Sequence, residues 1–104
     1  MFIELANGLN EQAASVRGFE ACARDARGRI TDDPANAAAW LLVSRAAQLF
    51  VEAYDDQPLT LGVAGKELEQ FREILQILDS AHAGGSADAM LEALNKVALK
   101  LMKV

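Results

Sequence analysis

Apolar residues recur every three or four positions along most of this 104-residue chain, which is the spacing of one face of an α-helix. The first series consists of Leu5, Leu9, Val16, Phe19, Ala23, Ala26 and Ile30. It predicts a helix over roughly residues 10–29, with Gly28 near its C-terminal end. No segment alternates apolar and polar residues as a strand would, so the pattern predicts an all-α protein.

An Asp-Asp-Pro sequence separates the first helical pattern from the second. Asp33 can cap free backbone amides, and Pro34 fits the first helical position, where its missing N–H leaves no hydrogen bond unmade. We therefore expect a second helix from here to about Tyr54. This helix has an unusually wide apolar stripe, so it is predicted to be the central one. Trp40 lies within that stripe, and the core is favoured over a partner interface for it.

Pro58 and two glycines mark the remaining helix boundaries. A third helix is expected to begin between Leu59 and Val63, because Pro58 excludes helical geometry in the residue before it. Its predicted core positions are Leu61, Leu68, Phe71, Ile74, Leu75, Ile77 and Leu78. Gly62 and Gly65 disfavour a helix interior, which suggests that another backbone approaches closely there.

The sequence His-Ala-Gly-Gly at residues 82–85 predicts a loop, after which Ser86 can cap a fourth helix. The inward positions of that helix are expected to be Leu91, Leu94, Val97, Ala98 and Leu101. Four helices joined by short connections are typical of an antiparallel four-helix up-down bundle. The length fits a single helical domain over residues 1–104.

Charge and composition exclude several classes of function. The net charge is −5, and residues 32–56 carry five acids against one base, Arg45, which argues against a grip on nucleic-acid phosphates. The acidic middle instead favours a basic protein partner. The longest apolar run, Ala37 to Val43, is too short to span a membrane, and the N-terminus shows no export signal. We therefore expect a cytoplasmic protein without membrane contact.

The chain contains few candidate catalytic residues. It contains one cysteine, Cys22, and one histidine, His82, so a nucleophile with a positioned base is not indicated. No metal-ligand spacing and no phosphate-binding glycine loop occur. The sequence therefore predicts no enzyme activity, no metal and no cofactor.

The stretch from Trp40 to Gln70 contains two short motifs. The chain reads SRAAQLFVEAY over residues 44–54 and LTLGVAGKE over residues 59–67. This stretch resembles a family of small helical immunity proteins of bacterial type VI secretion. The matching positions are Ser44, Gln48 and Leu49 in the first segment, and Leu59, Thr60, Leu61, Gly62, Lys66 and Glu67 in the second. Gly65 departs from the pattern, because a larger residue is expected there. Residues before Trp40 and after Gln70 carry no resemblance.

The resemblance implies a cytoplasmic antidote that binds a secreted effector toxin degrading NAD or NADP and covers its active site. We expect the toxin-binding surface between residues 52 and 66, where charged, aromatic and hydrogen-bonding groups gather. Its candidate residues are Glu52, Tyr54, Asp55, Asp56, Gln57, Thr60 and Lys66. The alternative is a helical adaptor or a self-associating bundle module without a toxin partner, since the wide stripe of the second helix could dock another helix. The sequence leaves open whether the chain forms a homo-oligomer.

Overall fold

The computed structural model describes residues 1–11, 15–54 and 60–102. The elements, in chain order, are α1 (Glu4–Glu11), α2 (Val16–Asp32), the short 3₁₀ helix η1 (Pro34–Asn36), α3 (Ala37–Tyr54), α4 (Leu61–Gly84) and α5 (Ala87–Met102). The described residues contain no strand, which confirms the all-α class. Over the same residues there are five α-helices, so the predicted number of four is wrong. The up-down order of the bundle stays a prediction.

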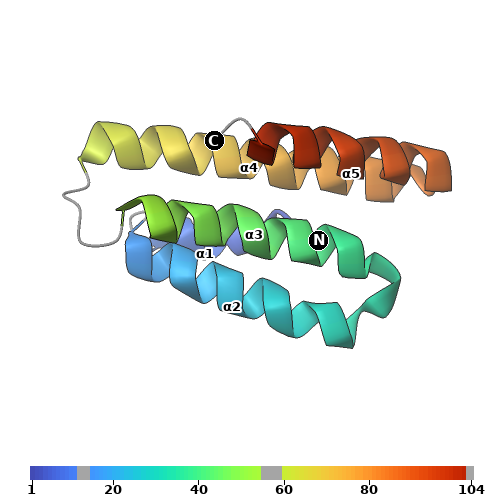
Figure 1. Cartoon of the computed structure of the whole chain (residues 1–104), viewed down its shortest axis with the longest axis horizontal. Coiled ribbons are helices and arrows are strands. Elements are labelled where there is room, and N and C mark those ends of the chain that lie inside the picture. Colours follow the sequence, from blue (N-terminus) through green and yellow to red (C-terminus); the bar gives the residue numbers. More distant parts are fainter. Residues whose placement is uncertain (12–14, 55–59, 103–104) are drawn as a thin grey trace.

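The helices pack in two layers that share one core. α2 forms its most extensive contacts with α3, and α4 packs against α5. Figure 1 shows the two pairs as layers, with α4 and α5 in yellow to red above α2 and α3 in blue to green. α1 lies behind α3 in this view and contacts both α2 and α4. α3 also touches α4 and α5, so it joins the two layers.

The first predicted helix is two helices, α1 and α2. α2 has its own N-cap, because the Ser15 Oγ accepts a hydrogen bond from the Gly18 N–H at 3.0 Å. The spacing of apolar residues did not reveal the boundary between α1 and α2, because Leu9 and Val16 are seven residues apart and would share a face in one continuous helix. Gly28 does not end the helix as predicted, because α2 continues to Asp32.

Asp33 does not cap backbone amides with its side chain, contrary to prediction. Pro34 begins the 3₁₀ turn η1, and α3 starts only at Ala37. The Asp33 Oδ2 instead accepts hydrogen bonds from Asn36 Nδ2 at 3.0 Å and from Trp40 Nε1 at 3.1 Å. These two bonds lower the pKa of the Asp33 carboxyl. The indole N–H therefore has a partner although the Trp40 side chain is only 1% exposed.

Three of the predicted helix ends agree with the structure, and side-chain caps mark two of them. α3 ends at Tyr54, and α4 begins after Thr60, whose Oγ1 accepts a hydrogen bond from the Val63 N–H at 3.3 Å. The Ser86 Oγ accepts one from the Ala89 N–H at 3.3 Å at the start of α5. α4 runs on through His82 to Gly84, so the predicted loop is shorter. Gly85 ends the helix with φ of 69°, a conformation that glycine adopts without strain.

The glycines at positions 62 and 65 do not mark a close approach of another helix, so that prediction is wrong. Both residues are exposed. A Cβ atom built at either position would meet nothing within 4 Å. Gly65 therefore weakens the helix, by about 1 kcal/mol relative to alanine, without an evident gain in packing.

Aromatic side chains from four segments form the centre of the core. The rings of Phe19 on α2 and Phe50 on α3 stack with centroids 3.8 Å apart, and Phe71 on α4 meets Phe19 edge-on at 5.4 Å. Phe2 packs against Trp40 with centroids 4.4 Å apart. Such pairs contribute roughly 0.5–1.5 kcal/mol beyond the area that they bury. The core assignment of Trp40 is thus confirmed.

Several predicted core positions differ from the structure. The half-buried ones are Leu68 and Ile77 of α4 and Leu94, Ala98 and Leu101 of α5. Leu91 is 58% exposed, because the buried face of α5 is centred on Ala93 and Val97. Leu91 precedes Val97 by six residues, which places it about 120° around the helix from that face. Because apolar residues occur at many positions of α5, their spacing alone did not determine which side of the helix faces the core.

Asp79 of α4 binds the N-terminal residues 1–3 through hydrogen bonds and an ion pair. Its carboxylate accepts hydrogen bonds from the Phe2 N–H at 2.7 Å and the Ile3 N–H at 2.9 Å, and it lies 3.2 Å from the Met1 amino group. Phe2 is fully buried as a result of this placement. Burial alone would raise the pKa of Asp79, but the two hydrogen bonds and the ammonium charge together lower it.

Replacing Phe71 by alanine should reduce the free energy of unfolding by about 3–5 kcal/mol, because the substitution removes a buried ring and leaves a cavity. Urea denaturation followed by circular dichroism measures the change. Glu69→Ala, at an exposed position of the same helix, should alter stability by less than about 0.5 kcal/mol. Equal effects of the two substitutions would contradict the assigned core.

Asp79 should make stability depend on acidic pH. Its folded pKa is lowered, so its contribution is complete above the unfolded value of about 3.9 and is lost as the pH falls through the folded value. Asp79→Ala should reduce the free energy of unfolding by about 1–3 kcal/mol at pH 7. Urea titrations at pH 7 and pH 3 compare the two proteins. A difference that does not narrow at pH 3 would show that the Asp79 charge is not responsible.

Candidate functional site

The described part of the predicted toxin-binding surface lies where α3 ends and α4 begins. Tyr54, the last residue of α3, is half-buried, and its hydroxyl donates a hydrogen bond to the Glu67 Oε1 at 3.3 Å. Its ring also packs against Phe50, with centroids 4.8 Å apart. Partial removal from water raises the pKa of Tyr54, and the charge and hydrogen bond of Glu67 raise it further. Tyr54 therefore remains a neutral donor that links α3 to α4.

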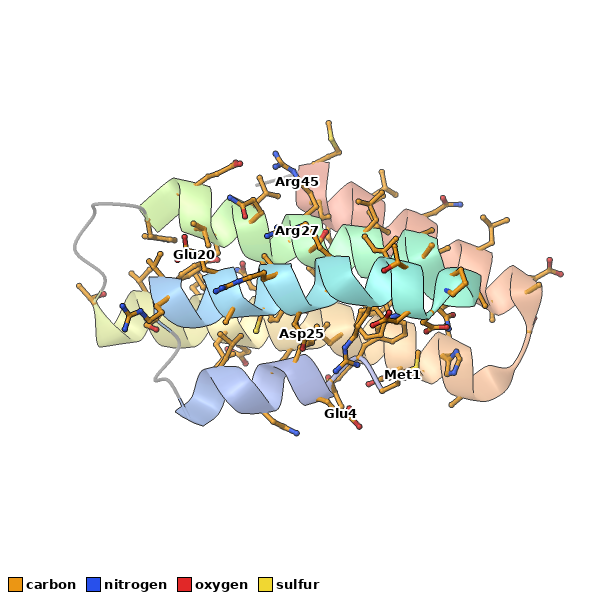
Figure 2. All side chains as sticks on the ribbon, turned by 90° about the horizontal axis from the view of Figure 1, so that it is seen from below. Met1, Glu4, Glu20, Asp25, Arg27 and Arg45 are labelled. Carbon is orange, nitrogen blue, oxygen red and sulfur yellow. The ribbon has the colours of Figure 1, made fainter. Side chains whose placement is uncertain are left out.

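Glu52 is exposed and forms an ion pair within α3, with 3.4 Å between its Oε1 and the Arg45 Nη1. Figure 2 shows Arg45 toward the α5 side of the molecule, whereas Met1 and Glu4 lie at the opposite edge, near α1. Both members of the pair are about half exposed, so the pair contributes little to stability. Both charges are accessible to a partner on that side.

The other predicted residues have different positions. Thr60 is exposed, and its hydroxyl is engaged in capping α4. Lys66 is exposed on the first turns of α4. Asp55, Asp56 and Gln57 lie outside the described residues. Of the candidates, the structure therefore places Tyr54 in an interhelical contact, Glu52 and Lys66 on accessible helix surfaces, and Thr60 in a structural role.

A pocket that the sequence did not predict opens beside Tyr54, with a volume of about 150 Å³. Its lining residues are Phe19, Ala46, Leu49, Phe50, Ala53, Tyr54, Glu67, Gln70, Phe71, Ile74 and Leu101. The three phenylalanines are buried and form its floor, whereas Ala53 and Gln70 are exposed at its rim. The pocket lies between α3 and α4, and Leu101 of α5 closes one side.

The available sequence signal for this pocket is weak. Leu49 and Ala53 lie four residues apart on α3, as do Gln70 and Ile74 on α4, so each pair lines one side of its helix. Periodicity alone does not distinguish a filled interhelical space from an open one. The distinction depends on which side chains from three helices meet, and small residues such as Ala46 leave the space unfilled.

Cys22 has the properties of an inert core cysteine. Its side chain is buried, and its Sγ donates a hydrogen bond to the Leu5 carbonyl oxygen at 3.3 Å. Burial, with a smaller effect of the Asp25 charge, raises the pKa of the thiol to about 11. His82 is exposed in the last turn of α4, with its ring edge-on to Phe2 at 6.3 Å.

Residues 1–11, 15–54 and 60–102 contain no group of three or more histidine, cysteine, aspartate or glutamate side chains arranged to hold a metal ion. None of the helices in these ranges combines the length and apolar character of a membrane span.

Comparison of the chain with protein-family models, curated proteins and solved structures found no match in any of the three. The resemblance to type VI immunity proteins therefore rests on the residues between Trp40 and Gln70 and stays a prediction.

The thiol of Cys22 should be nearly unreactive in the folded protein. With a pKa of about 11, the thiolate is a fraction on the order of 0.1% at pH 8, against roughly a quarter for an ordinary thiol. Dithionitrobenzoate should therefore label the native protein at least about 100-fold more slowly than the protein in 6 M urea. Comparable rates in the two conditions would contradict the buried environment.

Proposed function

We propose that this protein is an immunity protein that binds a secreted effector toxin in the cytoplasm, covers its active site and has no turnover of its own. The observation that carries the proposal is the surface around Tyr54, where an accessible apolar pocket is bordered by charged and hydrogen-bonding groups. The sequence resemblance over residues 40–70 supplies the toxin class, an enzyme that degrades NAD or NADP.

The arrangement of this surface suits tight binding. Tyr54 is held by the Glu67 carboxylate on one side and by the Phe50 ring on the other, so little rotamer freedom is left to lose on association. A partly buried tyrosine beside an apolar pocket is a common hot spot in protein interfaces. The helices that carry it are fixed by the same aromatic core, which keeps the surface preorganised.

Electrostatics also support a basic partner surface. The chain has a net charge of −5, and Asp55 and Asp56 directly follow Tyr54 in the sequence. Acids at the rim of an interface mainly accelerate encounter with a cationic partner, whereas a carboxylate that becomes buried against an arginine slows dissociation. An active-site cleft that binds phosphates of a dinucleotide would present such cationic groups.

The second candidate function is a helical adaptor or self-associating module. It is favoured by three apolar side chains on the outer surface of α5, because Leu91, Leu99 and Met102 are 58%, 66% and 83% exposed. An apolar helix surface of this kind can dock a second helix. Light scattering after size-exclusion chromatography distinguishes the two: a dimer that Leu99→Glu converts to a monomer would favour this alternative.

The antidote proposal predicts that a toxin is encoded beside the gene for this protein. Cells that express this toxin should grow only when the protein is co-expressed, and variants of this surface should lose protection. Tyr54→Ala removes the anchored ring, and lysines at Asp55 and Asp56 reverse the local charge. Both variants should bind the toxin more weakly, by at least about tenfold for Tyr54→Ala. Charge reversal should also reduce the salt dependence of association. Growth assays and binding kinetics at two salt concentrations provide the measurement.

Lysines at Glu20 and Glu92 form the matched control, because these exposed glutamates lie on α2 and α5 and give the same change in net charge. That variant should protect as the wild type does. If Tyr54→Ala and the Asp55–Asp56 reversal leave protection and rates unchanged while the fold is retained, this surface is not the toxin-binding site.

A further inference from the structure

The pocket beside Tyr54 combines an aromatic floor with a single charge. Among its described lining residues, Glu67 is the only charged one. The remaining polar groups at its opening are the Tyr54 hydroxyl and the Gln70 amide. The salt bridges of the described residues do not include Glu67, which accepts a hydrogen bond from the neutral Tyr54 hydroxyl at 3.3 Å. Among the described residues, the pocket therefore has one carboxylate without a counter-charge.

The volume limits the occupant to one side chain. A cavity of about 150 Å³ bounded by apolar side chains can hold a molecule the size of benzene. The pocket described here has the same volume and buried phenylalanines at its base. It is thus large enough for one long or aromatic side chain and too small for a whole turn of helix.

The position of Glu67 decides which kind of side chain fits. A purely apolar occupant would displace water from the Glu67 carboxylate without offering it a donor, and burying an unpaired charge is unfavourable. A side chain with an apolar stem and a cationic end satisfies both parts of the pocket. Arginine fits better than lysine, because its planar guanidinium pairs with a carboxylate through two hydrogen bonds, stacks on aromatic rings and is more weakly hydrated.

We propose that this pocket accepts one arginine side chain of a partner protein, with its stem against Phe50 and Phe71 and its guanidinium on the Glu67 carboxylate. The inference rests on the proposed function for the identity of that partner, a toxin, and not for the chemistry of the pocket. The Tyr54 hydroxyl would give up its bond to Glu67 or share the carboxylate with the guanidinium. Glu67 is thereby assigned a binding role that the candidate residues from the sequence did not include.

The test uses the amide-capped amino acid N-acetyl-arginine amide as the probe and the citrulline analogue as a neutral control of nearly the same shape. Methyl groups of Leu49, Ile74 and Leu101 line the pocket and report binding in carbon–proton NMR spectra. We expect the arginine probe to shift these methyl signals at millimolar concentration, and to bind roughly fivefold or more tightly than citrulline. Equal binding of both probes, or no shift at these methyls, would overturn the proposal.

Two variants separate the charge from the cavity. Glu67→Gln should remove the preference for arginine over citrulline, and Glu69→Gln, on an exposed position of the same helix, should leave it unchanged. Ala53→Leu adds bulk at the exposed rim, so it should block both probes without disturbing the buried core. Circular dichroism verifies the fold of each variant. A wild-type preference in Glu67→Gln would show that the carboxylate does not recognise the guanidinium.

These experiments test the pocket proposal and the antidote proposal separately. If the arginine probe binds as expected but no neighbouring toxin is neutralised, the antidote proposal fails and the pocket assignment stands. If a toxin is neutralised equally well by the wild type, Glu67→Gln and Ala53→Leu, the pocket assignment fails and the antidote proposal stands.

Discussion

The stacked contact between Phe19 and Phe50, with ring centroids 3.8 Å apart, is the interaction on which the rest of the fold depends. It fixes α2 against α3, and the edge-on contact of Phe71 with Phe19 adds α4 to the same cluster. These rings also form the floor of the pocket beside Tyr54. The position of the candidate site is therefore set by the core, and a change in the packing of these helices would alter both.

The sequence predicts the parts of this fold that depend on local chemistry and on a strong apolar period. Thr60, Ser86 and Gly85 act at helix ends because hydroxyl caps and a left-handed glycine satisfy backbone groups wherever the helix stops. The break at Ser15 was missed, because a seven-residue interval keeps two separate helices in phase. The exposed position of Leu91 was missed as well, since the rotation of α5 is decided by contacts with α3 and α4.

In the candidate site, too, local features could be predicted from the sequence and contacts between helices could not. Tyr54 could be selected from the sequence, because an aromatic residue at a helix end next to acids is a recognisable interface pattern. Its pairing with Glu67 could not, since it joins residues thirteen positions apart on two different helices. Asp33 shows the same effect: its cap position was predicted correctly as a boundary, but its carboxylate binds Asn36 and Trp40 side chains instead of backbone amides.

An open pocket above the aromatic cluster has an energetic consequence. A side chain in this space would make dispersion contacts with the pocket lining, including the half-buried Leu49 and Tyr54. Because the space is open, the free protein lacks those contacts and is less stable than a filled core would make it. A partner that fills the space restores those contacts, and binding to the folded state alone raises its stability in proportion to the logarithm of partner concentration over Kd. The small side chains of Ala46 and Ala53 leave room for a ligand. Because they do not fill the space themselves, they also reduce the stability of the free chain. Filling a packing defect would have the same thermodynamic effect, so selectivity for a cationic side chain, and not the gain in stability itself, identifies a binding pocket.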